Sequence, residues 1–272
     1  MTLNEVTERL KEAGVAEARH EAMLLVSSIF DIPYSRLMLE GDRDLLDSRL
    51  EKAVSRRQKR EPLQYILGSW QFMNETYRVT PEVLIPRADT EVLVELAIRS
   101  IPRGGRFADL CSGSGCVGIS TLAAREDLTC VSVEKYPGAF ALTVENGEAN
   151  GVSRRLSAIL GDVTEDVFEK DGRFDAILSN PPYVTEAEYE SLDPELYFEP
   201  KVALTDGGDG LSVIRRIIEI YPDHLRDGGF LALEIGADQA EAVSRIASEC
   251  GLGYDVLKDH SGHDRVIVMK KK

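Results

Sequence analysis

A glycine-rich loop between a short strand and a helix is the feature that most constrains the fold of this chain. The run Arg106–Leu110 predicts a strand and residues 119–125 predict a helix. Between them, Gly113, Gly115 and Gly118 match the pattern G-x-G-x-x-G. Glycine at these positions permits a tight turn and lets the backbone approach a ligand closely. The arrangement predicts a nucleotide-type binding loop in an α/β sheet.

Two acidic residues follow the next two predicted strands. Glu134 ends the strand at residues 129–133 and lies 19 residues after Gly115, the place for a carboxylate that accepts hydrogen bonds from a ribose diol. Asp162 follows the strand Leu156–Leu160 and could accept from an adenine amino group. Each acid alone also fits a solvated strand end, but together they favour an adenosine site.

A rigid segment with carbonyl acceptors follows the apolar run at 174–178. It is Asn180-Pro181-Pro182-Tyr183. The asparagine precedes a proline and is therefore held extended, while the prolines have restricted φ and no N–H. Such a segment suits a planar NH2 group, although a simple turn also fits. The glycine loop alone is equally compatible with a dehydrogenase, whereas this segment favours transfer of a methyl group from S-adenosylmethionine to an NH2 group.

These motifs make the chain resemble, nearly from end to end, the release-factor glutamine methyltransferases of the PrmC/HemK type. The segments that carry the resemblance are 62–68, 84–91, 109–115, 180–183, 225–236 and 262–266. Asn-Pro-Pro-Tyr alone is shared with adenine methyltransferases of DNA, and its combination with Ile-Pro-Arg-x-Asp-Thr-Glu is far more specific. Ala88 stands where many members have proline, and Glu134 where many have aspartate. Neither departure removes a needed chemical group.

The resemblance implies a fold, an activity and a set of site residues. The implied fold is α/β, a class I S-adenosylmethionine-dependent methyltransferase with a doubly wound, seven-stranded sheet whose last strand is antiparallel. The implied reaction methylates N5 of the glutamine in the Gly-Gly-Gln motif of class I peptide chain release factors and yields S-adenosylhomocysteine. The implied cofactor-binding residues are Asp109, Cys111, Gly113, Gly115, Glu134, Asp162 and Asn180. The implied catalytic and substrate-binding residues are Asn180, Pro181, Pro182 and Tyr183, with Arg87 added for substrate.

The apolar pattern changes along the chain and predicts three regions. Helical spacing of apolar residues predicts a helical substrate-binding domain at 1–75. A hairpin-like linker is expected at 76–88. From 89 to 272, strands alternate with helices, which predicts a parallel doubly wound catalytic domain. The acidic loop at 186–199 is expected to form the rim of the substrate opening.

Charge and composition narrow the partners. Lys+Arg 32 against Asp+Glu 47 gives a net charge of -15, which disfavours stable, sequence-independent binding of nucleic acid. The basic run at 56–60 fits either a local basic patch or the solvated C-terminal end of a helix, and the helix end is favoured. The sequence has no apolar stretch of membrane-spanning length and no apolar leader, so a cytoplasmic protein without a membrane partner is expected.

Cysteine and histidine usage predicts no metal site. The four cysteines have no C-x-x-C spacing, and the three in or beside predicted strands near the glycine loop fit buried thiols in a reducing compartment. His260 and His263 are interpreted as loop residues beside a Ser-Gly turn. Three alternatives to release-factor methylation remain open: methylation of another protein's glutamine, such as that of a ribosomal protein, methylation of a nucleic-acid base amino group, and a nucleotide-binding protein or dehydrogenase of another kind.

Overall fold

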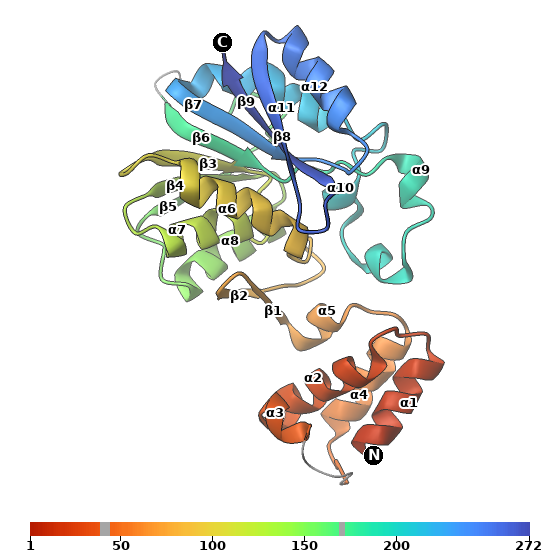
Figure 1. Ribbon diagram of the computed structural model, residues 1–272. Helices are drawn as coiled ribbons and strands as arrows, with labels where there is room; N and C mark the ends of the chain where they lie inside the picture. The colour runs from red at the N-terminus through yellow and green to blue at the C-terminus, as the bar shows by residue number, and fades with distance from the viewer. Residues whose placement is uncertain (39–43, 169–171) are drawn as a thin grey trace. The chain divides into compact units, whose positions relative to one another are not determined.

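The computed structural model describes residues 1–38, 44–168 and 172–272 (Figure 1). Packing divides the chain into two compact units, Met1–Ser69 with Asp193–Phe198, and Trp70–Leu192 with Glu199–Lys272. The boundaries expected at residues 75 and 88 stay predictions about domains. The packing units differ from them in two respects, since the hairpin groups with the sheet and the segment 193–198 groups with the N-terminal helices.

The N-terminal unit is built from helices that bury one apolar stripe. They are α1 Leu3–Glu12, α2 Ala18–Phe30, α3 Tyr34–Leu37, α4 Ser48–Gln58 and α5 Leu63–Leu67. Thr2 and Glu5 form a capping box that satisfies the first backbone donors of α1. Asp47 caps α4, and Gly68 ends α5 in the left-handed conformation. The helical spacing in the sequence thus agrees with α1, α2 and α4, whereas the short helices α3 and α5 were not predicted.

The segment 193–198 belongs to the N-terminal unit through a buried cluster of ion pairs. Glu195, in η2 Pro194–Phe198, accepts from Arg57 at 2.9 Å and from Arg60 at 2.6 Å. Arg57 also binds Glu21 at 2.5 Å, and its side chain is only 5% exposed. The sequence interpretation of this basic run as a solvated helix end is thus wrong at Arg57, because two carboxylates distant in the sequence bury and neutralise it.

The second unit begins with a hairpin and contains a seven-stranded sheet. The hairpin strands are β1 Ser69–Phe72 and β2 Glu75–Arg78. The sheet has the order β5-β4-β3-β6-β7-β9-β8. Its strands are β3 Arg106–Leu110, β4 Thr129–Glu134, β5 Leu156–Leu160, β6 Phe174–Ser179, β7 Leu225–Glu234, β8 Leu252–Lys258 and β9 Asp264–Lys271. Only β9 runs antiparallel to its neighbours, which confirms the predicted sheet.

Helices cover both faces of the sheet (Figure 1). One layer contains α6 Glu91–Ser100, α7 Cys116–Ala124 and α8 Pro137–Ala149, and the other contains α11 Ser212–Ile220 and α12 Ala240–Glu249. The shorter elements are η1 Ala88–Thr90, α9 Glu186–Tyr189, α10 Lys201–Leu204 and η3 Tyr221–His224. The apolar faces of the helices in the two layers pack on the central strands, where Phe107 and Phe174 are fully buried. Among residues 1–38, 44–168 and 172–272, no helix is both long and apolar enough to cross a membrane.

The strand order reverses between β3 and β6, and this switch point positions the site. Chain connections leave β3 towards β4 on one side, while β6 returns on the other side. Leu110 of β3 is in register with Ser179 of β6, and the Ser179 hydroxyl donates to the Leu110 carbonyl at 2.8 Å. Open α/β sheets bind ligands outside the carboxyl ends of strands at such a point. The glycine loop and Asn180 therefore emerge side by side.

The ion-pair cluster around Glu195 gives a stability prediction. Glu195→Gln removes the charge that Arg57 and Arg60 share, so we expect the N-terminal unit to lose about 1–3 kcal/mol of unfolding free energy. Urea unfolding followed by circular dichroism measures the change. Glu190→Gln, at an exposed position nearby in the sequence, is the matched control. Equal stability of the two variants would contradict a structural role for Glu195.

Candidate active site

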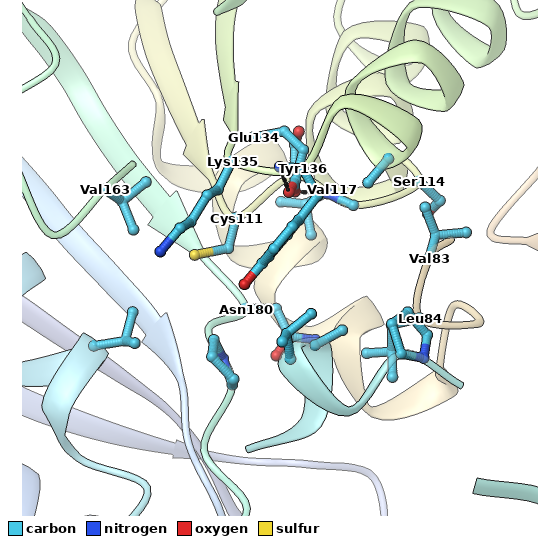
Figure 2. A pocket seen from close by; sticks show the side chains of 18 of the residues that line it. Val83, Leu84, Cys111, Ser114, Val117, Glu134, Lys135, Tyr136, Val163 and Asn180 are labelled. Atoms are coloured by element: carbon cyan, nitrogen blue, oxygen red, sulfur yellow. Dashed lines mark hydrogen bonds between the residues drawn. The ribbon is translucent and has the colours of Figure 1, made fainter. Parts of the chain in front are cut away.

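A cavity of about 290 Å³ opens at the carboxyl ends of β3, β4 and β6. Its polar lining includes Glu134, Asp162 and Asn180, and its apolar lining includes Val117 and Val163 (Figure 2). Such a mixture of apolar wall and few polar groups is typical of sites for small organic ligands. All lining residues belong to the second unit.

The glycine loop adopts the conformation that its sequence predicts. Gly113 and Gly115 have φ values of 55° and 83°, in the left-handed region that favours glycine. Gly115 is the N-cap of α7, so backbone N–H groups at the start of that helix lie beside the cavity. A Cβ on Gly118 would lie 3.0 Å from the Asp109 carboxylate, so glycine lets α7 pack closely on the strands. Local backbone conformation or close packing thus explains why glycine occupies each of these three positions.

Asp109 supports the loop from beneath instead of lining the cavity. Its Oδ2 accepts from the Gly118 N–H at 3.0 Å, and the residue is 1% exposed. Burial raises the pKa of Asp109 to about 7, although the hydrogen bond from Gly118 acts in the opposite direction. Its expected membership of the cofactor site stays a prediction, and the geometry assigns it an indirect part, through the position of the loop.

Cys111 lines the cavity in a strained backbone conformation. Its φ of 58° is unusual for a residue other than glycine and costs about 1–3 kcal/mol. Burial raises the pKa of its thiol to about 12, so the sulfur stays protonated at neutral pH. A protonated thiol is a poor nucleophile. Cys111 is therefore part of the cavity wall, with its thiol in the neutral form.

Glu134 and Asp162 lie at consecutive strand ends, as the sequence predicts, and both line the cavity. Glu134 accepts from the backbone N–H groups of Gly113 and Tyr136, each at 2.9 Å. Asp162 forms an ion pair with Lys135 at 2.7 Å and caps the following turn through Thr164. Burial raises the pKa of Asp162, but Lys135 and Thr164 outweigh that effect and leave the pKa below its usual value. Asp162 is thus an ionised acceptor.

The Asn180–Tyr183 segment divides its residues between the cavity and the protein interior. Asn180 and Pro182 line the cavity, whereas Pro181 is buried. The Asn180 Nδ2 donates to the Thr90 hydroxyl at 3.1 Å. The Tyr183 hydroxyl points away from the cavity and donates to Glu234 at 3.1 Å. The segment therefore presents an amide and one proline to a ligand, and its tyrosine anchors it to the neighbouring strand β7.

Arg87 lines the cavity, where its guanidinium pairs with the buried carboxylate of Glu199. Glu199 also accepts from the Ile85 N–H at 2.9 Å. This carboxylate therefore joins the segment that contains Ile85 and Arg87 to the segment that precedes Pro200. None of residues 186–199, the expected rim, lines this cavity; Pro200, Val202 and Ala203 do. The expected part of this loop in the rim of the substrate opening stays a prediction; residues 193–198 pack with the N-terminal helices, and the cavity lining begins at Pro200.

Sequence reasoning missed several residues in and behind the cavity wall, among them Lys135, Tyr136, Thr90 and Glu234. Tyr136, which is 39% exposed, and Lys135 extend into the pocket together with Cys111, opposite Asn180 (Figure 2). Thr90 and Glu234 are buried behind Asn180. A carboxylate at the end of the apolar run Phe-Leu-Ala-Leu-Glu was a usable signal for Glu234. No local signal marked Tyr136, since its role depends on the strand end that precedes it.

Comparison with protein families covers most of the chain. Residues 2–68 match a model described as the PrmC N-terminal domain, and residues 88–239 match the methyltransferase small domain. A release factor glutamine methyltransferase of Geobacter sulfurreducens is 40% identical over 263 residues, with 95% of this chain and 91% of the relative covered. This chain belongs to the release factor glutamine methyltransferase family. The resemblance and the fold class expected from the sequence are thereby confirmed.

Further relatives agree with this assignment. The family member of Cereibacter sphaeroides is 39% identical, with 95% of this chain and 93% of the relative covered. A methyltransferase structure from Pyrococcus furiosus superposes with a TM-score of 0.54 over 71% of this chain and 86% of that one, at 18% identity. That likeness concerns the fold alone. In the present chain, over the residues that the structure describes, no group of three or more His, Cys, Asp or Glu side chains could hold a metal ion.

The support that Asp109 gives to the loop predicts a pH effect on stability. A carboxyl whose folded pKa is raised to about 7 contributes less as pH rises from its unfolded pKa of about 4 towards 7, because ionisation is disfavoured only in the folded state. Asp109→Asn cannot ionise. We therefore expect the stability of Asp109→Asn relative to wild type to increase between pH 5 and pH 8. Urea unfolding of both proteins at both pH values measures it, and a constant difference would contradict the raised pKa.

Proposed function

We propose that this family member transfers a methyl group from S-adenosylmethionine to the side-chain N5 of the glutamine in the Gly-Gly-Gln motif of class I peptide chain release factors. The observation that carries the proposal is the position of Asn180, whose amide opens onto the cavity formed by the glycine loop and the two strand-end acids. Membership of the release factor glutamine methyltransferase family supports the choice of a release factor as substrate. Since release factors act in translation, we place the reaction in the cytoplasm.

The cavity fits the cofactor by the chemistry of its donors and acceptors. The Glu134 carboxylate suits the ribose hydroxyls, and the ionised Asp162 suits an adenine amino group. The exposed ring of Tyr136 offers a flat apolar surface for a base. When bound, the cofactor supplies an electrophilic methyl carbon. Gly113 and Gly115 give the backbone room to approach it, and Cys111 completes the wall.

Asn180 and Pro181 would orient the attacking nitrogen. An amide nitrogen is a weak nucleophile because its lone pair is delocalised into the carbonyl. Two acceptors, the Asn180 side-chain oxygen and the Pro181 backbone carbonyl, can hold both N–H hydrogens and turn the nitrogen towards the methyl group. Orientation of this kind contributes up to about 7–11 kcal/mol in well-aligned cases. No strong base is needed, since the nitrogen becomes acidic as it is alkylated.

Pro182 and Arg87 contribute to the approach of the substrate in this proposal. Pro182 keeps the wall beside Asn180 rigid, because its φ is restricted. Arg87, which its pairing with Glu199 holds at the cavity, is placed to meet polar groups of the incoming loop. Tyr183 acts from behind, through its hydrogen bond to Glu234. Glycines beside the target glutamine would let the substrate backbone come close to this wall.

The central test is methylation of an intact class I release factor, followed by mass spectrometry of the Gly-Gly-Gln peptide. We expect wild-type protein to add one methyl group to the glutamine. Asn180→Ala should lower the turnover rate by about 10²–10³, by analogy with the loss of one preorganised polar group elsewhere. Affinity for S-adenosylhomocysteine should hardly change. Near-normal turnover in this variant would refute the mechanism, and faster methylation of an oligonucleotide adenine would favour the nucleic-acid alternative.

A second test concerns the cofactor. Glu134→Ala removes the acceptor of the ribose hydroxyls and of two backbone N–H groups, so we expect S-adenosylhomocysteine binding to weaken by about 1–3 kcal/mol. Isothermal titration calorimetry measures the affinity. Glu148→Ala, at an exposed position of α8, is the matched control and should bind as wild type does. Unchanged affinity in Glu134→Ala would remove this role from Glu134.

A further inference from the structure

A buried chain of polar side chains lies behind Asn180. Asn180 Nδ2 donates to the Thr90 hydroxyl at 3.1 Å, and the Tyr183 hydroxyl donates to Glu234 Oε1 at 3.1 Å. Thr90 and Glu234 are each 1% exposed. The second carboxylate oxygen, Glu234 Oε2, is buried and has no hydrogen-bond partner among the residues that the structure describes. A buried acceptor without a donor is costly, which points to a neighbour that can supply a proton.

Thr90 is that neighbour. It is as buried as Glu234, and a hydrogen bond from its hydroxyl lowers the pKa of the Glu234 carboxyl against the larger effect of burial. The Thr90 oxygen already accepts a hydrogen from Asn180, while its single proton remains to be donated. An ionised carboxylate can only accept. The hydrogen bonds therefore run in one direction: Asn180 donates to Thr90, and Thr90 donates to Glu234. Tyr183 donates to the same carboxylate from the other side.

This direction matters because an asparagine amide has two nearly isosteric orientations. Its oxygen and its NH2 group exchange places when the amide plane rotates by a half turn, with little change in shape. One orientation presents an acceptor to the substrate amide and the other presents a second NH2 group, which faces the substrate donors and repels them. Packing alone discriminates poorly between the two, whereas a hydrogen bond to Thr90 does.

We propose that Glu234 and Thr90 are positioning residues that hold the Asn180 amide with its carbonyl oxygen towards the substrate. Glu234 orients the Thr90 hydroxyl, and Thr90 then accepts from the Asn180 NH2 group. Tyr183 uses the same carboxylate to anchor the end of the Asn180–Tyr183 segment. The inference rests on the proposed role of Asn180 in methyl transfer and adds what sets the orientation of its side chain.

The direction of the hydrogen bonds between Asn180, Thr90 and Glu234 depends on the charge of Glu234. Burial raises the pKa of Glu234 to about 7, while Thr90, Arg265 and Tyr183 lower it and Asp89 raises it further. Arg265 also forms ion pairs with Asp89 at 3.3 Å and with Asp259 at 3.2 Å. Cys116, on α7, also feels the Glu234 charge, and burial raises the pKa of its thiol to about 12. Glu234 is thus a buried carboxyl whose charge changes near pH 7.

Protonation would reverse the hydrogen bonds. A neutral carboxyl carries a proton that it can donate to Thr90, whose own proton then turns towards Asn180 and favours the flipped amide. As pH falls through the pKa of Glu234, the turnover rate should therefore fall. Glu234→Gln imitates this neutral form, because its NH2 group donates to Thr90 at every pH. The variant keeps the shape of the side chain and removes the titration.

The experiment compares Thr90→Val, Thr90→Ser and Glu234→Gln in the full-length protein, with intact release factor as substrate. We expect Thr90→Val and Glu234→Gln to lower kcat by about 10–100-fold, as removal of a preorganising polar group does. KM for the release factor and affinity for S-adenosylhomocysteine should change by less than about 3-fold, a small free energy on the affinity scale. Thr90→Ser keeps the hydroxyl and should restore most of the rate. The wild-type kcat should rise between pH 6 and pH 8, and that of Glu234→Gln should stay low and depend less on pH, with Asp109 still titrating in that range.

A readout independent of activity separates this inference from the proposed function. The Asn180 NH2 protons, assigned in the NMR spectrum by their loss in Asn180→Ala, should exchange slowly with water in wild type and Thr90→Ser, and rapidly in Thr90→Val and Glu234→Gln. Equal kcat and equal exchange in Thr90→Val and Thr90→Ser would overturn the inference, as would a Glu234→Gln enzyme with wild-type rate and pH profile. If Thr90→Val fails to fold, the isosteric Glu234→Gln decides. Slow wild-type exchange without methylation of the release factor would instead refute only the proposed function.

Discussion

The parallel pairing of β3 with β6 is the constraint on which the site depends. Leu110 and Ser179 are the last residues of that register, so the glycine loop and Asn180 leave the sheet at the same edge. A slip of one residue would exchange the faces of every side chain on the strand. Both strands are buried on their two faces, and that burial resists such a slip. The glycine loop and the Asn180–Tyr183 segment, about 65 residues apart in the sequence, are thereby held in contact with one cavity.

Buried carboxylates concentrate at this edge of the sheet, and they are stabilised in two different ways. Asp109 and Glu134 accept hydrogen bonds from backbone N–H groups of the loop, whereas Glu234 faces hydroxyl groups and Arg265. Burial disfavours the charged form of a carboxyl, and hydrogen bonds to the charged form offset that penalty. In Asp109 and Glu234 burial outweighs the bonds, so their pKa values lie near 7. Acids that titrate near neutrality are commonly found at functional sites. In this fold one supports the binding loop and the other lies behind the amide.

The N-terminal unit shows how a short segment from elsewhere in the chain can complete a small helical core. Glu195 lies more than 130 residues from Arg57 and Arg60, yet it neutralises both. Two guanidinium groups beside one another would be costly to bury without such a carboxylate. The acidic stretch after Tyr183 therefore has two parts with different roles: η2 packs with the helices, and the residues from Pro200 onwards line the cavity.

The sequence alone determined the features that arise from short stretches of chain. Apolar runs predicted the strands, glycine spacing predicted the loop, and the Asn-Pro-Pro-Tyr segment at a strand end predicted the chemistry, because each depends on neighbours within a few residues. Motifs quoted for the family located part of the cavity lining, including Arg87 and Cys111, and spacing from the glycine loop located Glu134. Only the tertiary structure decided which polar groups meet. Thr90 and Asn180 are 90 residues apart, and Tyr183 and Glu234 are 51 apart. Hydrogen-bond partners at such separations are selected by strand order and register, which no local pattern encodes, and so the network behind Asn180 became visible only in the folded chain.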